Sequence, residues 1–313
     1  MSSFIARGRS WVVGRIAVGA RLVFPYWLRR RLIPVQDWLT AVWNRYVDPG
    51  FARRIRHYDP ETMPEVSIML ITWNRLRMMR EGLLSLLEKT KGVNYEVIAW
   101  DNGSTDGTAE FLDDIAAKHP QVRVIHHPEN VGLNGVALSV KAARGYYLIK
   151  MDDDVMRFPD DWLPKQLHAF KKLPQIGYLA ANVVQDELTN GEKEPPENYT
   201  VVDYDGIVLE HGPTWGWCTM TSLDVLKRVG NFPRRRGRKW YGEDREYLRR
   251  CLRAGYTPAI LQDVVVYHAS GPAKNEEFGY LQECINKYEE AAYAPHKQQR
   301  MKEYFEKREV AGE

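Results

Sequence analysis

Short apolar runs alternate with helix-forming stretches along the middle of this 313-residue chain, and this alternation constrains the fold more than any other feature. Four apolar runs rich in β-branched or aromatic residues are expected to form strands, at 66–72, 95–100, 122–125 and 146–151. Three helices are expected between them, at 78–87, 105–118 and 136–143. Strands that alternate with helices at this spacing predict βαβ units, and therefore an α/β fold with a mainly parallel central sheet flanked by helices.

The alternation divides the chain into three regions. Residues 63–272 carry it and are expected to form one α/β domain. Residues 1–62 are rich in Arg and Trp, whereas residues 273–313 contain Glu, Lys, Gln and Tyr in helix-favouring runs. We therefore expect helical extensions at both ends of the domain.

The N-terminal 60 residues contain eleven Arg, no Lys and three Asp, a local charge of +8 in a chain whose net charge is +3. They also contain Trp11, Trp27, Trp38 and Trp43. One interpretation is an amphipathic segment on an anionic membrane surface, with indole rings at the headgroup level and Arg on lipid phosphates. The alternative is a helical extension that packs on the main domain or on another subunit of a homo-oligomer.

No stretch reaches the ~18 uninterrupted apolar residues of a membrane-spanning helix. The best candidate, 11–28, is broken by Arg15, Arg21 and Pro25. Three scattered cysteines fit a reducing compartment. We therefore expect a cytoplasmic protein, which would be peripheral on the inner face of the membrane if residues 1–60 bind lipid. The Arg-rich start is also compatible with a mitochondrial transit peptide, although the segment is not rich in Ser.

Three adjacent carboxylates, Asp152, Asp153 and Asp154, follow the last of the four apolar runs. Adjacent carboxylates repel one another, so a fold that holds them needs a neutralising partner. A divalent cation bound by oxygen ligands is one such partner, and it can bridge to a diphosphate. This interpretation predicts a site for Mn²⁺ or Mg²⁺. The alternative is a solvated acidic turn that caps the next helix.

A second polar cluster, 101–107, follows the strand expected at 95–100. Asp101 can accept hydrogen bonds from a base edge or a ribose, and Gly103 allows close approach of the backbone. The segment is also typical of a strand-to-helix turn in which Ser104 or Thr105 caps the helix. The two interpretations are compatible, because one residue can cap the helix while its neighbour binds a nucleoside.

Two acidic residues and one histidine stand out near the end of the α/β region. Glu243 and Asp244 open an expected helix, where the helix dipole favours carboxylates and a general base would be held rigidly. His268 follows the expected strand at 264–266. Beside a bound cation, a neutral imidazole would be a third ligand. A purely structural role is the alternative for each of them.

In their order and spacing, these motifs resemble the family 2 glycosyltransferases of the GT-A fold. The resemblance covers residues 64–271 and rests on Thr72 to Arg75, Asp101 to Thr108, Asn130 to Leu133, the Asp triplet, Gly216 to Met220, Gly242 to Asp244, and His268. It implies a Rossmann-like GT-A domain. It also implies inverting transfer of a sugar from a nucleotide-diphosphate donor to a hydroxyl of a glycan or of a lipid-linked acceptor.

The resemblance further implies a role for each matching residue. Asp154 occupies the metal-coordinating position, with His268 as a further ligand, and Asp244 matches the catalytic base, with Glu243 beside it. The donor nucleotide is expected to contact Thr72, Asn74, Arg75, Asp101, Asp152 and Asp153.

The sequence departs from the family pattern at several positions. Asn102 stands where the family commonly has a second Asp, and Thr72 stands where it usually has Pro. The stretch at 132–145 lacks the basic residue often found there, so Lys150 and the basic loop at 233–239 are candidates for the diphosphate contacts. This loop could be a lid over the donor or a grip on a lipid-linked pyrophosphate, and the alternative is a solvated surface loop.

Three tryptophans, Trp215, Trp217 and Trp240, flank the expected acceptor cleft. Aromatic faces suit sugar rings, although aromatic residues are as common in plain packing. Two other classes of function stay open: a catalytically silent GT-A carbohydrate-binding module, and a membrane-associated assembly module that acts through residues 1–60. Nucleic-acid binding is not expected, because the basic residues are concentrated among Trp at the N-terminus rather than along a recognised reader.

Overall fold

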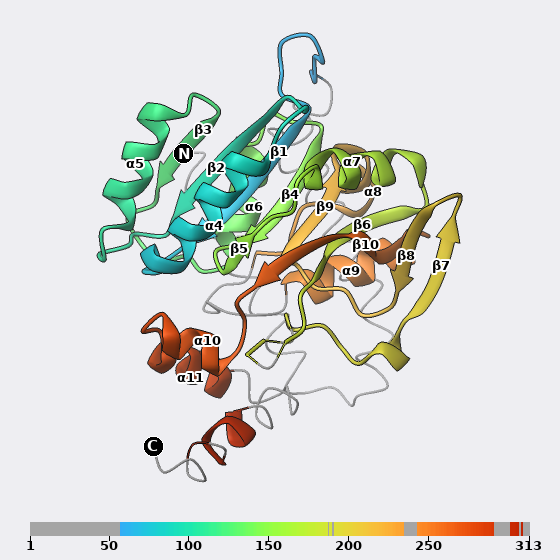
Figure 1. Ribbon diagram of the computed structural model, residues 1–313. Helices are drawn as coiled ribbons and strands as arrows, with labels where there is room; N and C mark the ends of the chain where they lie inside the picture. Colours follow the sequence, from blue (N-terminus) through green and yellow to red (C-terminus); the bar gives the residue numbers. More distant parts are fainter. Residues whose placement is uncertain are drawn as a thin grey trace, which may run out of the picture.

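Figure 1 shows the computed structural model of the protein, which describes residues 57–186, 188–189, 191–234, 243–290, 301–306 and 308. The interpretations of residues 1–56, of Trp240 and of the loop at 235–239 lie outside these described residues and stay predictions.

In the described part of the chain, nine strands lie side by side in the order β3-β2-β1-β4-β9-β6-β10-β8-β7, and a tenth, β5, pairs with β10. Strands β1 to β4 run parallel to one another, as do β6 and β10. Strand β9 runs antiparallel between β4 and β6, and β8 runs antiparallel to β10 and β7. The strands are β1 Val66–Thr72, β2 Tyr95–Asp101, β3 Val122–His126, β4 Tyr147–Asp152, β5 Val155–Arg157, β6 Ile176–Val183, β7 Thr200–Tyr204, β8 Ile207–His211, β9 Cys218–Ser222 and β10 Thr257–His268.

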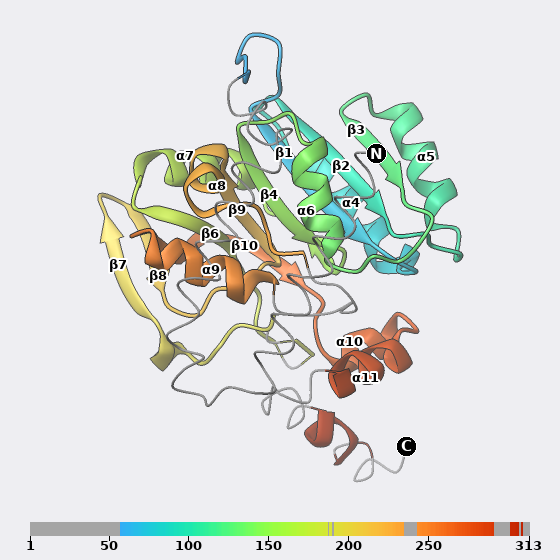
Figure 2. The same ribbon diagram turned by 180° about the vertical axis from the view of Figure 1, so that it is seen from behind.

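Helices cover both faces of this sheet. Helices α4 and α7 lie on the face seen in Figure 1, where Trp162 of α7 donates a 3.0 Å hydrogen bond to Thr90, just after α4. Helices α6, α8 and α9 lie on the opposite face, seen in Figure 2, where Arg250 of α9 donates to the Val229 carbonyl of α8 at 3.3 Å. The helices are α4 Leu76–Lys89, α5 Thr108–Lys118, α6 Asn134–Ala142, α7 Trp162–Lys172, α8 Leu223–Val229, α9 Glu243–Arg253, α10 Pro272–Glu277 and α11 Leu281–Glu290.

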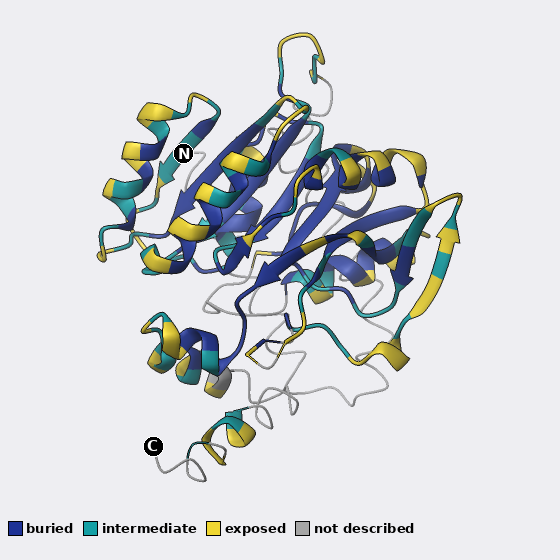
Figure 3. Cartoon of the chain, in the orientation of Figure 1, coloured by how far each residue is buried: buried dark blue, intermediate teal, exposed yellow. Residues whose placement is uncertain are grey.

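The core lies between the sheet and these two helix layers, and Figure 3 shows the central strands buried while the helices expose only their outer sides. Helix α4 buries one face through Met78, Met79, Leu83 and Leu86. The expected α/β fold with a mostly parallel sheet is therefore confirmed. The antiparallel strand β9 in the middle of the sheet was not predicted.

The parallel strands place their carboxyl ends at one edge of the sheet. Thr72 at the end of β1 is paired with Asp101 of β2, and Ile71 is paired with Asp152 of β4. Because β9 runs the other way, it begins at this same edge, where Cys218 pairs with Met151. Ligands in open α/β sheets bind beyond these carboxyl ends, so the fold gathers the candidate residues at the expected place.

The chain continues from β10 into α10 and α11, which lie below that edge in Figure 1. Residues 301–306 form a further helical turn. None of the helices among the described residues is both long and apolar enough to cross a membrane.

Candidate active site

Asp152, Asp154 and His268 each bring a potential ligand atom to within 4.8 Å of the others. Asp152 ends β4, Asp154 lies in the tight turn to β5, and β5 pairs with β10 so that His268 lies opposite Val155. Nε2 of His268 is 3.1 Å from Oδ1 of Asp154. Carboxylate oxygens and an imidazole nitrogen suit Mn²⁺, and the oxygens suit Mg²⁺. The cluster therefore fits a divalent cation.

The hydrogen bonds of His268 fix which nitrogen is available to a metal. Nδ1 lies 2.8 Å from the carbonyl oxygen of Gly191, which can only accept, so Nδ1 carries the proton. In the neutral ring Nε2 then offers a lone pair toward Asp154, as in histidines that bind metals. Burial lowers the pKa of His268, but the adjacent Asp154 carboxylate outweighs it and raises the pKa. A protonated His268 would thus donate from Nε2 to Asp154, whereas the neutral ring would offer that nitrogen to a cation.

Arg75, the residue just before α4, neutralises the other side of the Asp triplet. Its Nη1 lies 3.0 Å from Oδ2 of Asp154 and 3.4 Å from Oδ1 of Asp153. Burial raises the pKa of Asp154, but His268 and Arg75 outweigh burial and hold it well below the ordinary value. Burial raises the pKa of Asp153 to about 6 against the effect of Arg75, and the neighbouring Asp154 carboxylate adds to the increase.

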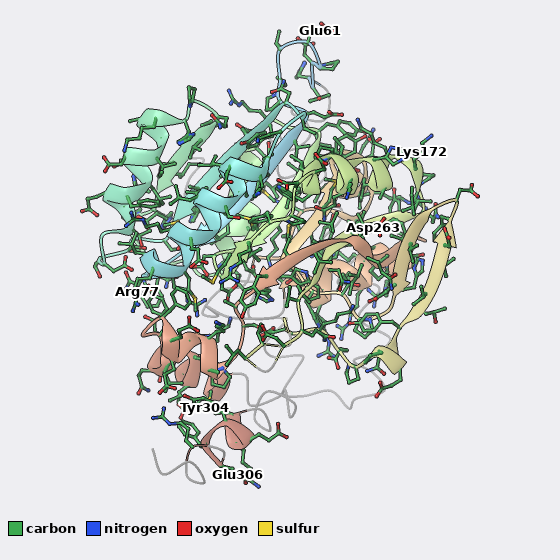
Figure 4. All side chains as sticks on the ribbon, viewed as in Figure 1. Glu61, Arg77, Lys172, Asp263, Tyr304 and Glu306 are labelled. Atoms are coloured by element: carbon green, nitrogen blue, oxygen red, sulfur yellow. The ribbon has the colours of Figure 1, made fainter. Side chains whose placement is uncertain are left out.

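The C-terminal helices hold Arg75 in place. Nη2 of Arg75 donates to the side-chain oxygen of Asn275 in α10, and its guanidinium lies 5.6 Å from the ring centre of Tyr280. Arg77, labelled in Figure 4, lies beside the same C-terminal segment. Its backbone N–H donates to the Tyr280 hydroxyl at 3.1 Å, and its Nη1 donates to the Phe278 carbonyl at 2.9 Å. Part of the extension predicted at 273–313 therefore forms a wall of the site. Asn275 and Tyr280 were not predicted.

Lys150 connects the Asp triplet to the two carboxylates at the start of α9. Its Nζ lies 3.2 Å from Asp152 Oδ1, 3.1 Å from Glu243 Oε1 and 2.9 Å from Asp244 Oδ2, and its side chain is 2% exposed. Burial lowers the pKa of Lys150, but these three carboxylates outweigh burial and raise it well above the ordinary value. Burial and Asp244 together raise the pKa of Glu243 to about 7 against the effect of Lys150.

Asp244 is held from three sides. Its Oδ2 accepts the ammonium of Lys150, and its Oδ1 accepts a 2.7 Å hydrogen bond from the hydroxyl of Tyr178, a buried residue of β6. Gly216 closes the third side, because a β-carbon there would lie 2.5 Å from both Asp244 oxygens and closer still to Nζ of Lys150. The sequence suggested neither Tyr178 nor the contact of Gly216 with Asp244.

The residues expected to contact the donor nucleoside lie together at the ends of β1 and β2. Asp101 is buried and accepts a 2.9 Å hydrogen bond from the Ser104 backbone, while its other oxygen lies 3.1 Å from Nδ1 of His126. Asn74 has a φ of 51°, and its side-chain oxygen accepts the Thr105 backbone N–H at 2.7 Å. Thr72 is buried, and its hydroxyl has no hydrogen-bond partner among the described residues. Asn74 therefore ties the two loops together, and Asp101 orders its own turn.

The two described tryptophans of the predicted acceptor cleft differ in position. Trp217 is 1% exposed, and its indole nitrogen donates to the Ala181 carbonyl at 2.8 Å. This burial contradicts the acceptor-side role expected for Trp217, whose ring instead packs against His268 with the ring centres 5.9 Å apart. Trp215 is partly buried, and it lines a groove along α9.

Residues 67–230, just over half of the chain, match the family model described as glycosyl transferase family 2. The chain belongs to this family. Among its relatives, the dolichol-phosphate mannosyltransferase of Pyrococcus furiosus is 30% identical over 108 residues, which cover 34% of this chain and 30% of the relative. The chondroitin synthase of Escherichia coli is 32% identical over 116 residues, which cover 36% of this chain and 17% of the relative. This family 2 chain therefore matches less than a third of the length of these two proteins.

Solved structures resemble this family 2 chain in fold. GalNAc-T7 with UDP, GalNAc and Mn²⁺ aligns with a TM-score of 0.54 at 16% identity, covering 68% of this chain and 45% of that one. The TarS fragment 1–349 from S. aureus in complex with UDP-GlcNAc aligns with a TM-score of 0.52 at 17% identity, covering 67% of this chain and 60% of that one. At these identities the likeness concerns the fold, and it confirms the expected GT-A arrangement.

Proposed function

We propose that this protein is a metal-dependent, inverting glycosyltransferase. It transfers a sugar from a nucleotide-diphosphate donor to a hydroxyl of a glycan or a lipid-linked acceptor. One observation carries the proposal: Lys150 joins a metal-fitting cluster, through Asp152, to a carboxylate suited to act as a base, Asp244. A sugar transfer needs a cation at the leaving diphosphate and a base at the attacking hydroxyl. The two must lie on either side of the reacting carbon.

Asp154 and His268, with Asp152 beside them, would hold Mn²⁺ or Mg²⁺. When bound, such a cation stabilises the negative charge that grows on the departing diphosphate. The hydrogen bond from His268 Nδ1 to Gly191 supports this role, because it turns Nε2 toward the carboxylates. Arg75, which contacts Asp153 and Asp154, is suited to bind the donor phosphates.

Asp244 would act as the general base. Each of its oxygens already accepts one hydrogen bond and has a second lone pair for the acceptor hydroxyl. As Asp244 takes the hydroxyl proton, the acceptor oxygen forms a bond to the anomeric carbon. The bond from that carbon to the diphosphate oxygen breaks, and its electron pair leaves with the diphosphate. Attack opposite to the leaving group inverts the configuration at the carbon.

The donor nucleoside would lie at the ends of β1 and β2, beside Thr72 and Asp101. The solved neighbours support a nucleotide sugar as the donor, since one contains UDP with GalNAc and Mn²⁺ and another contains UDP-GlcNAc. The relatives named a dolichol-phosphate mannosyltransferase and a chondroitin synthase support the two classes of acceptor, a lipid phosphate and a glycan.

Two substitutions test the proposal, with Asp263→Asn, at an exposed position of β10, as the control. General-base assistance contributes about 10²–10⁴ in rate, so Asp244→Asn is expected to lower kcat by that factor and leave donor affinity within about twofold. Asp154→Ala is expected to abolish the increase in donor affinity that Mn²⁺ produces in calorimetry. Wild-type turnover in Asp244→Asn would refute the base, and undiminished Mn²⁺ dependence in Asp154→Ala would refute the metal site.

A further inference from the structure

A groove of about 450 Å³ runs beside α9, and the chemistry proposed above does not use it. Its size lies within the range of pockets that bind small ligands. Helix α9 faces the viewer in Figure 2, next to β8. The walls of the groove are largely apolar and include Pro213, Trp215, Leu248, Leu252 and Pro258.

Two residues of the groove lining are sequence neighbours of residues at the proposed base. Arg245, which lines the groove, directly follows Asp244, and Trp215 directly precedes Gly216, which lies against the Asp244 carboxylate. Leu252 lines it seven residues further along the helix, which corresponds to two turns or about 10 Å. This order along α9 places the lining residues on the course that a molecule with its hydroxyl at Asp244 would follow along the helix.

The exposed side of the groove combines an exposed apolar side chain, Leu252, with the positive charges of Arg245 and Arg249. Leu252 is 56% exposed, although it lies among other apolar groups of the groove wall. Arg245 and Arg249 are exposed on the same face of α9, and neither forms an ion pair with the described residues. Guanidinium groups are suited to bind phosphate oxygens, so the groove matches an apolar chain that carries a phosphate.

We propose that this groove binds the hydrocarbon chain of a lipid-linked acceptor, with the acceptor phosphate on Arg245 and Arg249. The proposal rests on the glycosyl transfer proposed above and selects the lipid-linked acceptor from its two classes. A free glycan would place its hydroxyls against walls whose exposed surface is mostly apolar. The charge of +8 in residues 1–60, together with their tryptophans, suits the same anionic lipid environment.

The test measures binding of farnesyl phosphate to the full chain by calorimetry, below its micelle concentration and with EDTA present so that the metal cluster stays empty. Farnesol and inorganic phosphate serve as fragment probes. We expect farnesyl phosphate to bind at least tenfold more tightly than either fragment, because the chain and the phosphate are bound together.

Leu252→Gln is the decisive variant, and Leu84→Gln, at a 42% exposed position of α4, is its matched control. Both substitutions remove an exposed apolar side chain from a helix and keep a good helix former. We expect Leu252→Gln to weaken farnesyl phosphate binding about tenfold and Leu84→Gln to leave it within twofold. The pair Arg245→Gln and Arg249→Gln is expected to remove the preference for farnesyl phosphate over farnesol.

Equal binding by the two leucine variants, or no preference for farnesyl phosphate over its fragments, would overturn the proposal. A parallel titration of nucleotide sugars with Mn²⁺ separates this failure from a failure of the proposed function. If donor binding requires Mn²⁺ while farnesyl phosphate does not use the groove, only the acceptor assignment is lost. If no nucleotide sugar binds, the glycosyl transfer itself is refuted.

Discussion

Replacing Tyr178 by Phe removes one hydroxyl that positions the proposed base and leaves the ring in the core. The hydroxyl donates a 2.7 Å hydrogen bond to Asp244 Oδ1, and the ring packs against Tyr247 and Phe232. A hydrogen bond to a charged group contributes about 1.5–3 kcal/mol. If half of this is lost only in the transition state, kcat falls about four- to twelvefold, since about 1.4 kcal/mol corresponds to a factor of ten.

Tyr247→Phe provides the matched control. Tyr247 is as buried as Tyr178, their ring centres are 5.5 Å apart, and its hydroxyl lies 2.9 Å from the Thr221 hydroxyl rather than near Asp244. Both variants lose a buried hydrogen bond, so both are expected to lose about 1 kcal/mol or more of unfolding free energy in urea. Only Tyr178→Phe is expected to lower kcat, because only its hydroxyl orients the base.

The assay follows the release of nucleoside diphosphate at saturating acceptor and varied donor. A positioning role predicts a lower kcat for Tyr178→Phe with a donor KM within about twofold of the wild type. The reasoning would be refuted if the two tyrosine variants had the same kcat, since loss of core stability would then account for both.

Two further substitutions test the packing around the site and the stability of the sheet. In Gly216→Ala the new methyl would lie 2.5 Å from both Asp244 oxygens, so kcat is expected to fall at least tenfold, with about 1–3 kcal/mol lost in thermal unfolding; unchanged kinetics would show that the loop moves freely. Glu96 is buried and binds Ser67, Arg123 and Arg144, whose hydrogen bonds outweigh burial and lower its pKa. A lowered pKa contributes stability above the unfolded-state pKa that is lost as pH falls through the folded-state pKa. Urea unfolding of Glu96→Gln is therefore expected to show less stability at pH 7 than the wild type. The variant is also expected to lose less stability as the pH falls from 7 through the lowered pKa of Glu96. An equal acid loss in both proteins would contradict this role.

The sequence allowed the parallel half of the fold and the edge that carries the site to be predicted. The apolar run ending at Asp152 and the run ending at Asp101 became β4 and β2, and both carboxylates lie at the carboxyl edge. This inference succeeds because parallel strands that alternate with helices must point the same way. The proximity of Asp154 and His268 followed from the family resemblance and is now seen as a 3.1 Å contact.

The partners of these residues could not be predicted from local pattern. Tyr178 lies 66 residues from Asp244 in sequence, and Asn275 lies 200 residues from Arg75. Such contacts depend on tertiary packing, which no periodicity encodes. Trp217 shows the opposite error, since it was expected to flank the acceptor cleft although its side chain is buried in the core. One signal was present: a lysine inside the apolar run of β4 needs a buried carboxylate partner, and Lys150 has three.

The reversed strand β9 explains why base, metal cluster and groove lie together. Because β9 runs antiparallel between β4 and β6, the segment that leads into it reaches the carboxyl edge, where the parallel strands end. Gly216 in this segment lies against Lys150 and Asp244, while its neighbour Trp215 borders the groove along α9. A parallel strand in this place would have its start at the opposite edge, and the segment before it could contact neither Lys150 nor Asp244. The direction of one short strand thus connects the proposed catalytic centre to the proposed acceptor groove.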